Sequence, residues 1–176
     1  MQNIECKYEL REPALAAAVC RRLGARSLGT IRQRDTYFKV AEGRLKKREV
    51  LGEPAEWIFY HRTDRPRPRL SHFTIYSETE ARDRFGERPM PVWLVVDKAR
   101  GLWILGNVRV HIDEVRGLGS FLEIEARVST RNHAGLCQRR VRALLKHLGP
   151  LLGEPIGASY SDLLAQEQES ARSPRK

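Results

Sequence analysis

The sequence predicts an α+β fold: a closed eight-stranded antiparallel β-barrel with helices packed against its outside. Three observations predict this fold. Charged side chains occupy every second position along several strand-like segments, and such positions share one face of a strand. The positions between them are mostly apolar, so the opposite face can pack against helices. Short turns separate the segments, which is typical of antiparallel neighbours, and closing the sheet would place the charges inside.

The chain begins with a strand and a helix. Residues 4–10 alternate apolar and charged side chains, which indicates a strand with one buried face. Residues 13–23 predict a helix, because Pro13 is suited to the first helical turn and Gly24 to the position after the last turn.

A hairpin and a further strand follow. Residues 28–38 and 43–50 predict two strands joined by a turn at residues 41–43. Residues 56–62 alternate in the manner of another strand. Residues 64–69 contain two prolines and predict a loop.

The middle of the chain is rich in strands. Residues 78–85 predict a short helix. Gly101 and Gly106 are expected to interrupt the strands around them, because glycine weakens a strand and favours a turn. The predicted strands in this part of the chain are 72–76, 92–100, 102–104, 107–115 and 120–128.

The carboxy-terminal part predicts two helices and a tail. Residues 133–148 carry apolar side chains at helical spacing, and the sequence Gly149-Pro150 ends that helix. Residues 161–165 predict a short helix, whereas the polar residues 166–176 are expected to be disordered. We therefore predict one domain over residues 1–165, followed by this tail.

The composition describes a soluble globular protein with an anionic partner. The formal net charge is +10, which favours nucleic acid, a phosphorylated metabolite or acidic lipid. The longest apolar run is far shorter than the ~20 residues that cross a bilayer, and the first residues lack the layout of a secretion signal. The three cysteines are scattered and indicate free thiols in a reducing compartment, so we expect a cytoplasmic protein.

The predicted inner face carries cations from several strands. Arginine is suited to phosphate because its planar guanidinium group donates two hydrogen bonds to adjacent oxygens. Cations gathered in one cavity repel one another unless anions compensate, so a polyphosphate is a fitting ligand. The cations with the inward parity are Lys7, Arg44, Lys46, Arg48, Arg62, Lys98, Arg100 and Arg109.

Carboxylates share the same face. Glu123 and Glu125 lie two positions apart on one strand, and Glu5 and Asp113 have the parity to join them. Ligand sets made only of oxygen favour Mg²⁺ or Mn²⁺, and no two histidines have the spacing of a zinc site. We interpret His111 as a hydrogen-bonding residue of the wall. Carboxylates, a divalent ion and many cations are together what phosphoryl or nucleotidyl transfer requires.

Several blocks of this sequence resemble one known family. The segment Asn3-Ile4-Glu5-Cys6-Lys7 resembles the amino-terminal Glu-x-Glu-x-Lys signature of the CYTH superfamily, the triphosphate tunnel metalloenzymes. Asn3 departs from that signature, which has glutamate there, and a metal ion bound at this position would be held more weakly. The further matching blocks, in the order expected for the family, are 33–38, 43–49, 60–62, 96–100, 107–115, 117–125 and 160–164.

The resemblance implies a tunnel that binds a triphosphate together with Mg²⁺ or Mn²⁺. Family members include class IV adenylyl cyclases, thiamine triphosphatases and inorganic tripolyphosphatases, so the implied partner is ATP, tripolyphosphate or thiamine triphosphate. All eight cations above are implied to bind the phosphates. The implied metal ligands are Glu5, Glu123 and Glu125, with Asp113 nearby. The residues to which we assign catalytic roles are Lys7, Arg62 and Lys98.

Three functions are open at this point. The blocks at residues 107–111 and 117–121 look most like class IV adenylyl cyclases, so conversion of ATP to cyclic AMP and pyrophosphate ranks first. Hydrolysis of a triphosphate is the alternative, because the same residues would serve it. A binding module for polyphosphate or nucleic acid, without catalysis, is the third. We disfavour nucleic acid, expect no membrane partner, and note that related folds often form homodimers.

Overall fold

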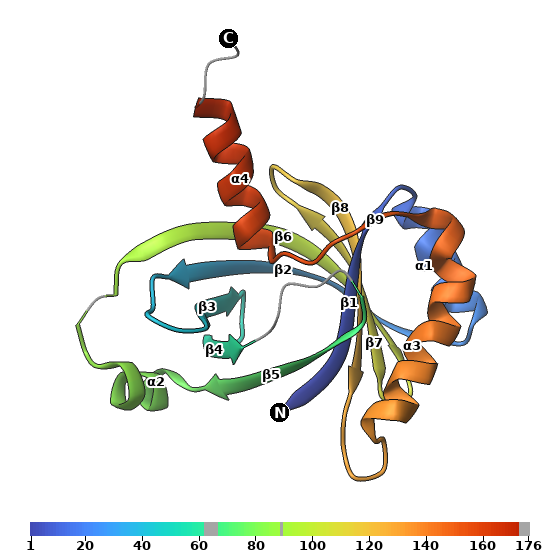
Figure 1. The fold of residues 1–176 in the computed structure, drawn as a ribbon, viewed down its shortest axis with the longest axis horizontal. Helices are drawn as coiled ribbons and strands as arrows, with labels where there is room; N and C mark the ends of the chain where they lie inside the picture. Colours follow the sequence, from blue (N-terminus) through green and yellow to red (C-terminus); the bar gives the residue numbers. More distant parts are fainter. Residues whose placement is uncertain (62–66, 89, 173–176) are drawn as a thin grey trace.

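The predicted antiparallel barrel of eight strands is confirmed in the computed structural model (Figure 1). The structure describes residues 1–61, 67–88 and 90–172. The strands follow one another around the barrel in the order β5-β4-β3-β2-β6-β7-β8-β1, and pairing of β5 with β1 closes it. A further strand, β9, pairs with the later part of β1. The strands are β1 (Gln2–Leu10), β2 (Arg26–Phe38), β3 (Arg44–Val50), β4 (Glu56–His61), β5 (Arg69–Tyr76), β6 (Val92–Leu105), β7 (Val108–Val115), β8 (Gly119–Arg127) and β9 (Leu152–Pro155).

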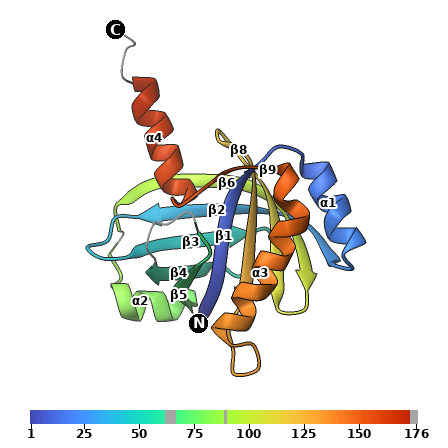
Figure 2. The same ribbon diagram turned by 45° about the vertical axis from the view of Figure 1, so that its right-hand side comes forward.

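The helices lie outside the barrel. Figures 1 and 2 both show α1 and α3 side by side against β1, β7 and β8, whereas α2 lies beside β4 and β5. The start of α4 lies near β6, and the rest of that helix extends away from the barrel. The helices are α1 (Pro13–Arg22), α2 (Glu78–Phe85), α3 (Ala134–Leu148) and α4 (Tyr160–Arg172), with a 3₁₀ turn at Gly149–Leu151.

The alternation of side chains along β8 explains both faces of the barrel. Leu122 and Ile124 point outward and are fully buried beneath the helices, where they join a large apolar cluster. Val141 and Leu148 of α3 belong to the same cluster. Glu123 lies between the two outward residues and therefore points into the barrel. The hydrophobic core thus lies between the barrel and the helices α1 and α3, which leaves the interior free for polar side chains.

A second apolar cluster lies where α4 begins. Tyr37 of β2, Val96 of β6 and Phe121 of β8 pack there with Tyr160, the first residue of α4. The ring centroids of Phe121 and Tyr160 are 5.1 Å apart. This cluster fixes the start of α4 at one end of the barrel.

Two predicted boundaries are wrong. Gly101 does not interrupt the sheet, because β6 runs through it and pairs it with Ile112 of β7 and Thr30 of β2. The pairing partners on both sides hold this glycine in the sheet, and the register irregularity falls on β2 instead. The last helix was predicted to end at residue 165 but continues to Arg172. The added residues are mainly glutamate, glutamine and alanine, which favour a helix even without apolar periodicity.

The remaining differences are small. β5 begins at Arg69, which we predicted to lie in the preceding loop, and the rest of that loop lies largely outside the described residues. Within the described part of the chain, no helix combines the length and apolar character that crossing a membrane requires.

Candidate active site

A cavity of about 530 Å³ lies inside the barrel, and all eight barrel strands contribute side chains to it. The carboxylates Glu5, Glu123 and Glu125, which were predicted to point inward, are among its lining residues. Six of the eight predicted cations line this cavity: Lys7, Lys46, Arg48, Lys98, Arg100 and Arg109. Arg44 instead lines a neighbouring cavity of about 930 Å³, where its guanidinium group donates to Asp162 at 2.8 Å. Arg62 lies outside the described residues.

Three of these cations converge on Asp35, a carboxylate to which the sequence analysis gave no role. Asp35 is 1% exposed. Its Oδ2 accepts hydrogen bonds from Lys98 Nζ at 2.6 Å and from Lys46 Nζ at 2.9 Å. Arg48 donates to both carboxylate oxygens, at 2.8 and 2.9 Å. Burial alone would raise the pKa of Asp35, but the charges of Arg48, Lys46 and Lys98 outweigh that effect and hold the pKa well below its usual value.

The pKa values of the two lysines in this cluster are lowered toward neutral pH. Burial lowers the pKa of Lys98 to about 7, and the nearby Arg48, Lys46 and Arg100 also lower it, whereas Asp35 raises it. Burial and Arg48 lower the pKa of Lys46 to about 8, again opposed by Asp35. The negative charge of Asp35 therefore helps to keep both lysines protonated.

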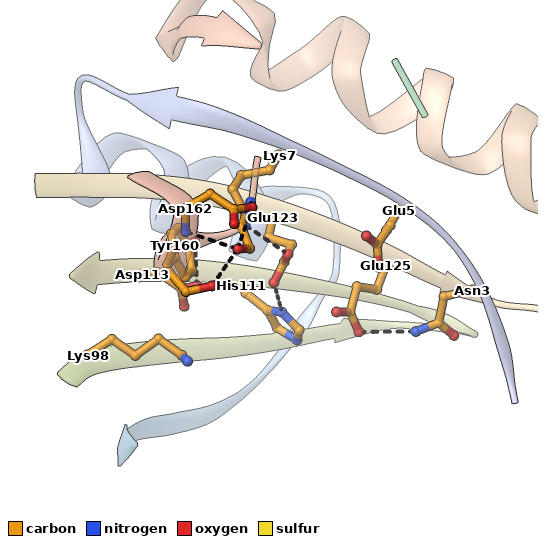
Figure 3. A network of polar contacts seen from close by, with 12 residues as sticks. Asn3, Glu5, Lys7, Lys98, His111, Asp113, Glu123, Glu125, Tyr160 and Asp162 are labelled. Carbon is orange, nitrogen blue, oxygen red and sulfur yellow. Dashed lines mark hydrogen bonds and ion pairs between the residues drawn. The ribbon is translucent and has the colours of Figure 1, made fainter. Parts of the chain in front are cut away.

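A second buried carboxylate, Asp113, holds Arg100. Arg100 donates from Nε at 2.7 Å and from Nη2 at 2.6 Å to the two oxygens of Asp113, and Tyr160 donates its hydroxyl proton to Oδ2 at 2.8 Å. Burial raises the pKa of Asp113, but Arg100 more than compensates, so the pKa is lowered. Figure 3 shows Asp113 turned toward Tyr160. Asp113 thus lies against an arginine and a tyrosine, and it is not in the ligand group described next.

One group of potential metal ligands lies on β7 and β8. His111, Glu123 and Glu125 each offer a ligand atom, and these atoms lie within 4.8 Å of one another, the only such group of three in the described residues. The His111 ring Nδ1 lies 3.3 Å from Glu123 (Figure 3). Glu5 is the cross-strand neighbour of Glu125. Two carboxylates directly opposite each other destabilise a sheet unless a cation lies near them.

Cations also neutralise this group in part. Glu123 lies 3.6 Å from Lys7 Nζ and 2.9 Å from Arg100 Nη2. Burial raises its pKa, but Lys7, His111 and Arg100 hold the pKa well below the usual value, so Glu123 is ionised. The two carboxylates suit Mg²⁺ and Mn²⁺, whereas the imidazole nitrogen suits a transition-metal ion. The donor set therefore fits a divalent ion, and it combines the predicted Glu123 and Glu125 with His111, which we had interpreted only as a hydrogen-bonding residue of the wall.

Asn3 positions one of these ligands. Its side-chain amide donates to Glu125 Oε2 at 3.3 Å, and Asn3 is buried at the cavity wall (Figure 3). On the same strand, Lys7 lies with its Nζ 3.7 Å from the centre of the Tyr160 ring, a cation–π contact. β1 thus brings an amide, a carboxylate and an ammonium group to the cavity at alternate positions.

Sequence reasoning missed Asp35, Arg69 and Tyr160 as residues of the site. Asp35 has the same parity as Gln33 and Tyr37, which was the available signal. Arg69 is buried with its Nη2 3.6 Å from Glu5, although we expected it in a loop. The inward position of Tyr160 depends on where α4 docks, and no local pattern predicts that.

Comparisons with known proteins agree with this geometry. The sequence model of the CYTH domain family matches residues 1–152. No curated protein matches the chain. Among solved structures, PH1012 of Pyrococcus horikoshii OT3 is similar, with a TM-score of 0.73 and 23% identity over 92% of this chain and 98% of the other.

Two further structures share the fold. A protein of Vibrio parahaemolyticus named as a candidate adenylate cyclase has a TM-score of 0.70 and 16% identity, over 93% of this chain and 97% of that protein. HpAC1 of Hippeastrum, named as a candidate adenylyl cyclase and described as having a dominant triphosphatase activity, has a TM-score of 0.63 and 17% identity, over 99% and 98% of the two chains.

Proposed function

Because this chain belongs to the CYTH domain family, we propose that it is a divalent-metal-dependent enzyme that acts on triphosphate compounds inside the barrel. The observation that carries this proposal is the joint lining of one cavity by six cations and by the carboxylates of the ligand group. A solvated strand face would not bury such charges. Burying them is costly unless they are paired or bind a ligand.

The cations are assigned to the phosphates. Arg48 and Arg100 each present a planar guanidinium group that their carboxylate partners hold in a fixed orientation. Lys7 and Lys98 keep the roles predicted for them, as ammonium groups near the reacting phosphates. The proposed phosphate-binding residues are Lys7, Lys46, Arg48, Lys98, Arg100 and Arg109.

The metal is assigned to the group on β7 and β8. Glu123, Glu125 and His111 would hold Mg²⁺ or Mn²⁺, with Glu5 facing Glu125 from β1. When bound, such an ion neutralises phosphate charge and lowers the barrier to attack at phosphorus. The chain's own residues would orient the triphosphate between these carboxylates and the cations of β3 and β6.

Of the two reactions, we propose the cyclase type first, on the resemblance of residues 107–111 and 117–121. The 3′-hydroxyl of ATP would release its proton and its oxygen would form a bond to the α-phosphorus as the bond from that phosphorus to the bridging oxygen breaks, and pyrophosphate would leave. Hydrolysis is the second candidate, favoured by the triphosphatase activity described for HpAC1. A water molecule would then attack the terminal phosphorus and release orthophosphate.

Incubation of the purified protein with Mn²⁺ and each of ATP, tripolyphosphate and thiamine triphosphate tests the proposal. Cyclic AMP with pyrophosphate supports the cyclase, whereas orthophosphate without cyclic AMP supports the hydrolase. Glu123→Gln should abolish metal-dependent turnover, and Glu114→Gln, on the outer face of β7, should not. Binding without turnover of any of the three compounds would support a non-catalytic module instead.

A further inference from the structure

The helices α1 and α3 carry cations and no carboxylates. Neither helix contains aspartate or glutamate, and the two lie side by side on the outside of the barrel (Figure 2). Together they therefore form one strongly positive surface, which we call the basic face. Its members, all exposed, are Arg21, Arg22, Arg139, Arg140, Arg142 and Lys146.

Three cations of the basic face form a row along α3. Arg139, Arg142 and Lys146 are spaced by three and four residues, so they lie on one side of the helix and span about 10 Å. Like charges at this spacing destabilise a helix. Among the described residues, none of the three forms an ion pair or a side-chain hydrogen bond. Nothing in the described chain therefore offsets their repulsion.

Structural roles explain some cations of the basic face but not the middle of α3. Arg140 donates hydrogen bonds to two asparagine side chains, and Arg21 lies over a tryptophan ring. The partial negative charge at the end of a helix stabilises cations in the last turn, which accounts for Lys146. Arg139 and Arg142 lie before that turn. An anionic partner would give both of them a role.

The composition of the basic face fits the phosphate backbone of a nucleic-acid duplex. Five of its six cations are arginines, whose planar group donates two hydrogen bonds to neighbouring phosphate oxygens. A lipid surface fits less well, because helices that bind membranes insert apolar side chains, whereas Val141 and Leu144 of α3 are buried against the barrel. Single strands are bound by aromatic rings that stack on bases, and neither helix contains phenylalanine, tyrosine or tryptophan.

A second copy of the chain is also a poorer partner. Two chains that each carry a formal net charge of +10 repel one another. The outer turns of α4 expose only Glu167 and Glu169, too few carboxylates to match the basic face. Nucleic acid is disfavoured on the sequence alone, which does not show that α1 and α3 lie side by side; their juxtaposition is what favours it here.

We propose that the basic face binds the backbone of double-stranded nucleic acid. Contacts to phosphates carry no sequence information, so binding should be independent of base sequence. The face is separate from the cavity, because α1 and α3 cover the outside of β1, β7 and β8 whereas the cavity lies inside the barrel. The inference therefore does not depend on the proposed function.

Fluorescence anisotropy with short labelled DNA and RNA duplexes tests the proposal. Between about 50 and 200 mM salt, the logarithm of the binding constant should fall with the logarithm of the salt concentration, with a slope of about −3 to −5. The triple variant Arg139→Gln, Arg142→Gln and Lys146→Gln should reduce the slope by about 0.9 for each residue and weaken binding about 10-fold or more at the lower salt. Glutamine keeps the helix propensity of these exposed positions.

The matched control removes the same net charge elsewhere. The triple variant Arg32→Gln, Arg82→Gln and Arg84→Gln changes three exposed cations of β2 and α2, and it should weaken duplex binding by less than about threefold. Circular dichroism of both variants checks the fold. Arg142→Gln alone, which should reduce the slope by about 0.9, provides a second measurement if the triple variant unfolds.

The other outcomes reject the basic face. Equal weakening by the control would show that net charge alone attracts the duplex, and an unchanged slope in the α3 variants would show that the duplex binds elsewhere. No binding to either duplex, with binding to vesicles that contain phosphatidylserine, would assign the face to a lipid surface instead. Turnover of triphosphates is measured separately, so its failure would leave this proposal untouched.

Discussion

Replacement of Asp35 by asparagine is the most direct test of how the charged interior is held together. The side chain is fully buried and receives four hydrogen bonds from Lys46, Arg48 and Lys98, all between 2.6 and 2.9 Å. Asparagine keeps the size of the side chain and one oxygen but removes the negative charge. Three cations would then face one another without their shared partner.

The expected loss of stability is large. Removal of one partner from a buried ion pair costs about 3–5 kcal/mol, because the other partner is left without compensation. For a domain of this size, about 1 kcal/mol corresponds to about 2–4 °C in melting temperature. We therefore expect Asp35→Asn to lower the melting temperature by about 6–20 °C at neutral pH.

The loss should depend on pH in a defined direction. Lys98 and Lys46 have pKa values of about 7 and about 8, so both are protonated at pH 6 and have largely lost that proton at pH 9. At pH 9, Arg48 is the partner of Asp35 in this cluster that remains fully charged, because the two lysines are largely neutral. The destabilisation caused by Asp35→Asn is accordingly greatest at pH 6 and smaller at pH 9.

Thermal and urea unfolding of both proteins at pH 6 and pH 9 measure this difference. Asp97→Asn is the matched control, because it removes an ion pair with Arg34 from the same two strands, β2 and β6, on their outer and partly exposed face. The control should change stability by about 1 kcal/mol or less. A loss for Asp35→Asn no greater than that of the control, or one that grows toward pH 9, would refute the reasoning.

Three further predictions follow from the site. Tyr160→Phe removes the hydrogen bond to the ionised Asp113 but keeps the ring, so calorimetry should show a fall in melting temperature of about 3–12 °C, and a fall below 1 °C would contradict the role of the hydroxyl. Tripolyphosphate binding should take up protons and weaken from pH 7 to pH 9, because Lys98 and Lys46 must be protonated to bind it. Calorimetry in buffers of different ionisation enthalpy measures the proton uptake, and equal heats of binding in all of them would contradict this prediction. Mn²⁺ at about 100 times its dissociation constant should raise the melting temperature by about 5–11 °C, EDTA should reverse the rise, and Glu123→Gln should show none.

The strict period of a β-strand explains why so much of the interior could be predicted. Once Glu123 points inward, Glu125 must also do so, while Leu122 and Ile124 point outward, and the structure has this arrangement. The antiparallel barrel followed from the same pattern. The extent of the last helix did not, because its outer turns are polar and depend on intrinsic helix propensity.

The partners of each inward side chain could not be predicted, because they depend on the stagger between strands. Asp113 and Glu123 share the inward parity and both contact Arg100 on β6. Their other partners differ, because Asp113 accepts from Tyr160 whereas Glu123 lies beside His111 on β7. In the sequence, Asp35 could be recognised only as an acidic residue within the block 33–38, with nothing to indicate its partners. Local sequence gives the direction of a side chain, whereas the register between strands decides what that side chain meets.

The two halves of the barrel are supported unequally. The helices α1 and α3 cover β1, β7 and β8, which carry the carboxylates of the proposed metal group. Neither apolar cluster of the described chain includes a residue of β3, β4 or β5. A bound triphosphate would contact side chains from both halves and so link the strands that the apolar clusters hold in place to the strands β3, β4 and β5, which those clusters do not include. Amide hydrogen exchange should then slow most in β3 and β4 when ligand is added.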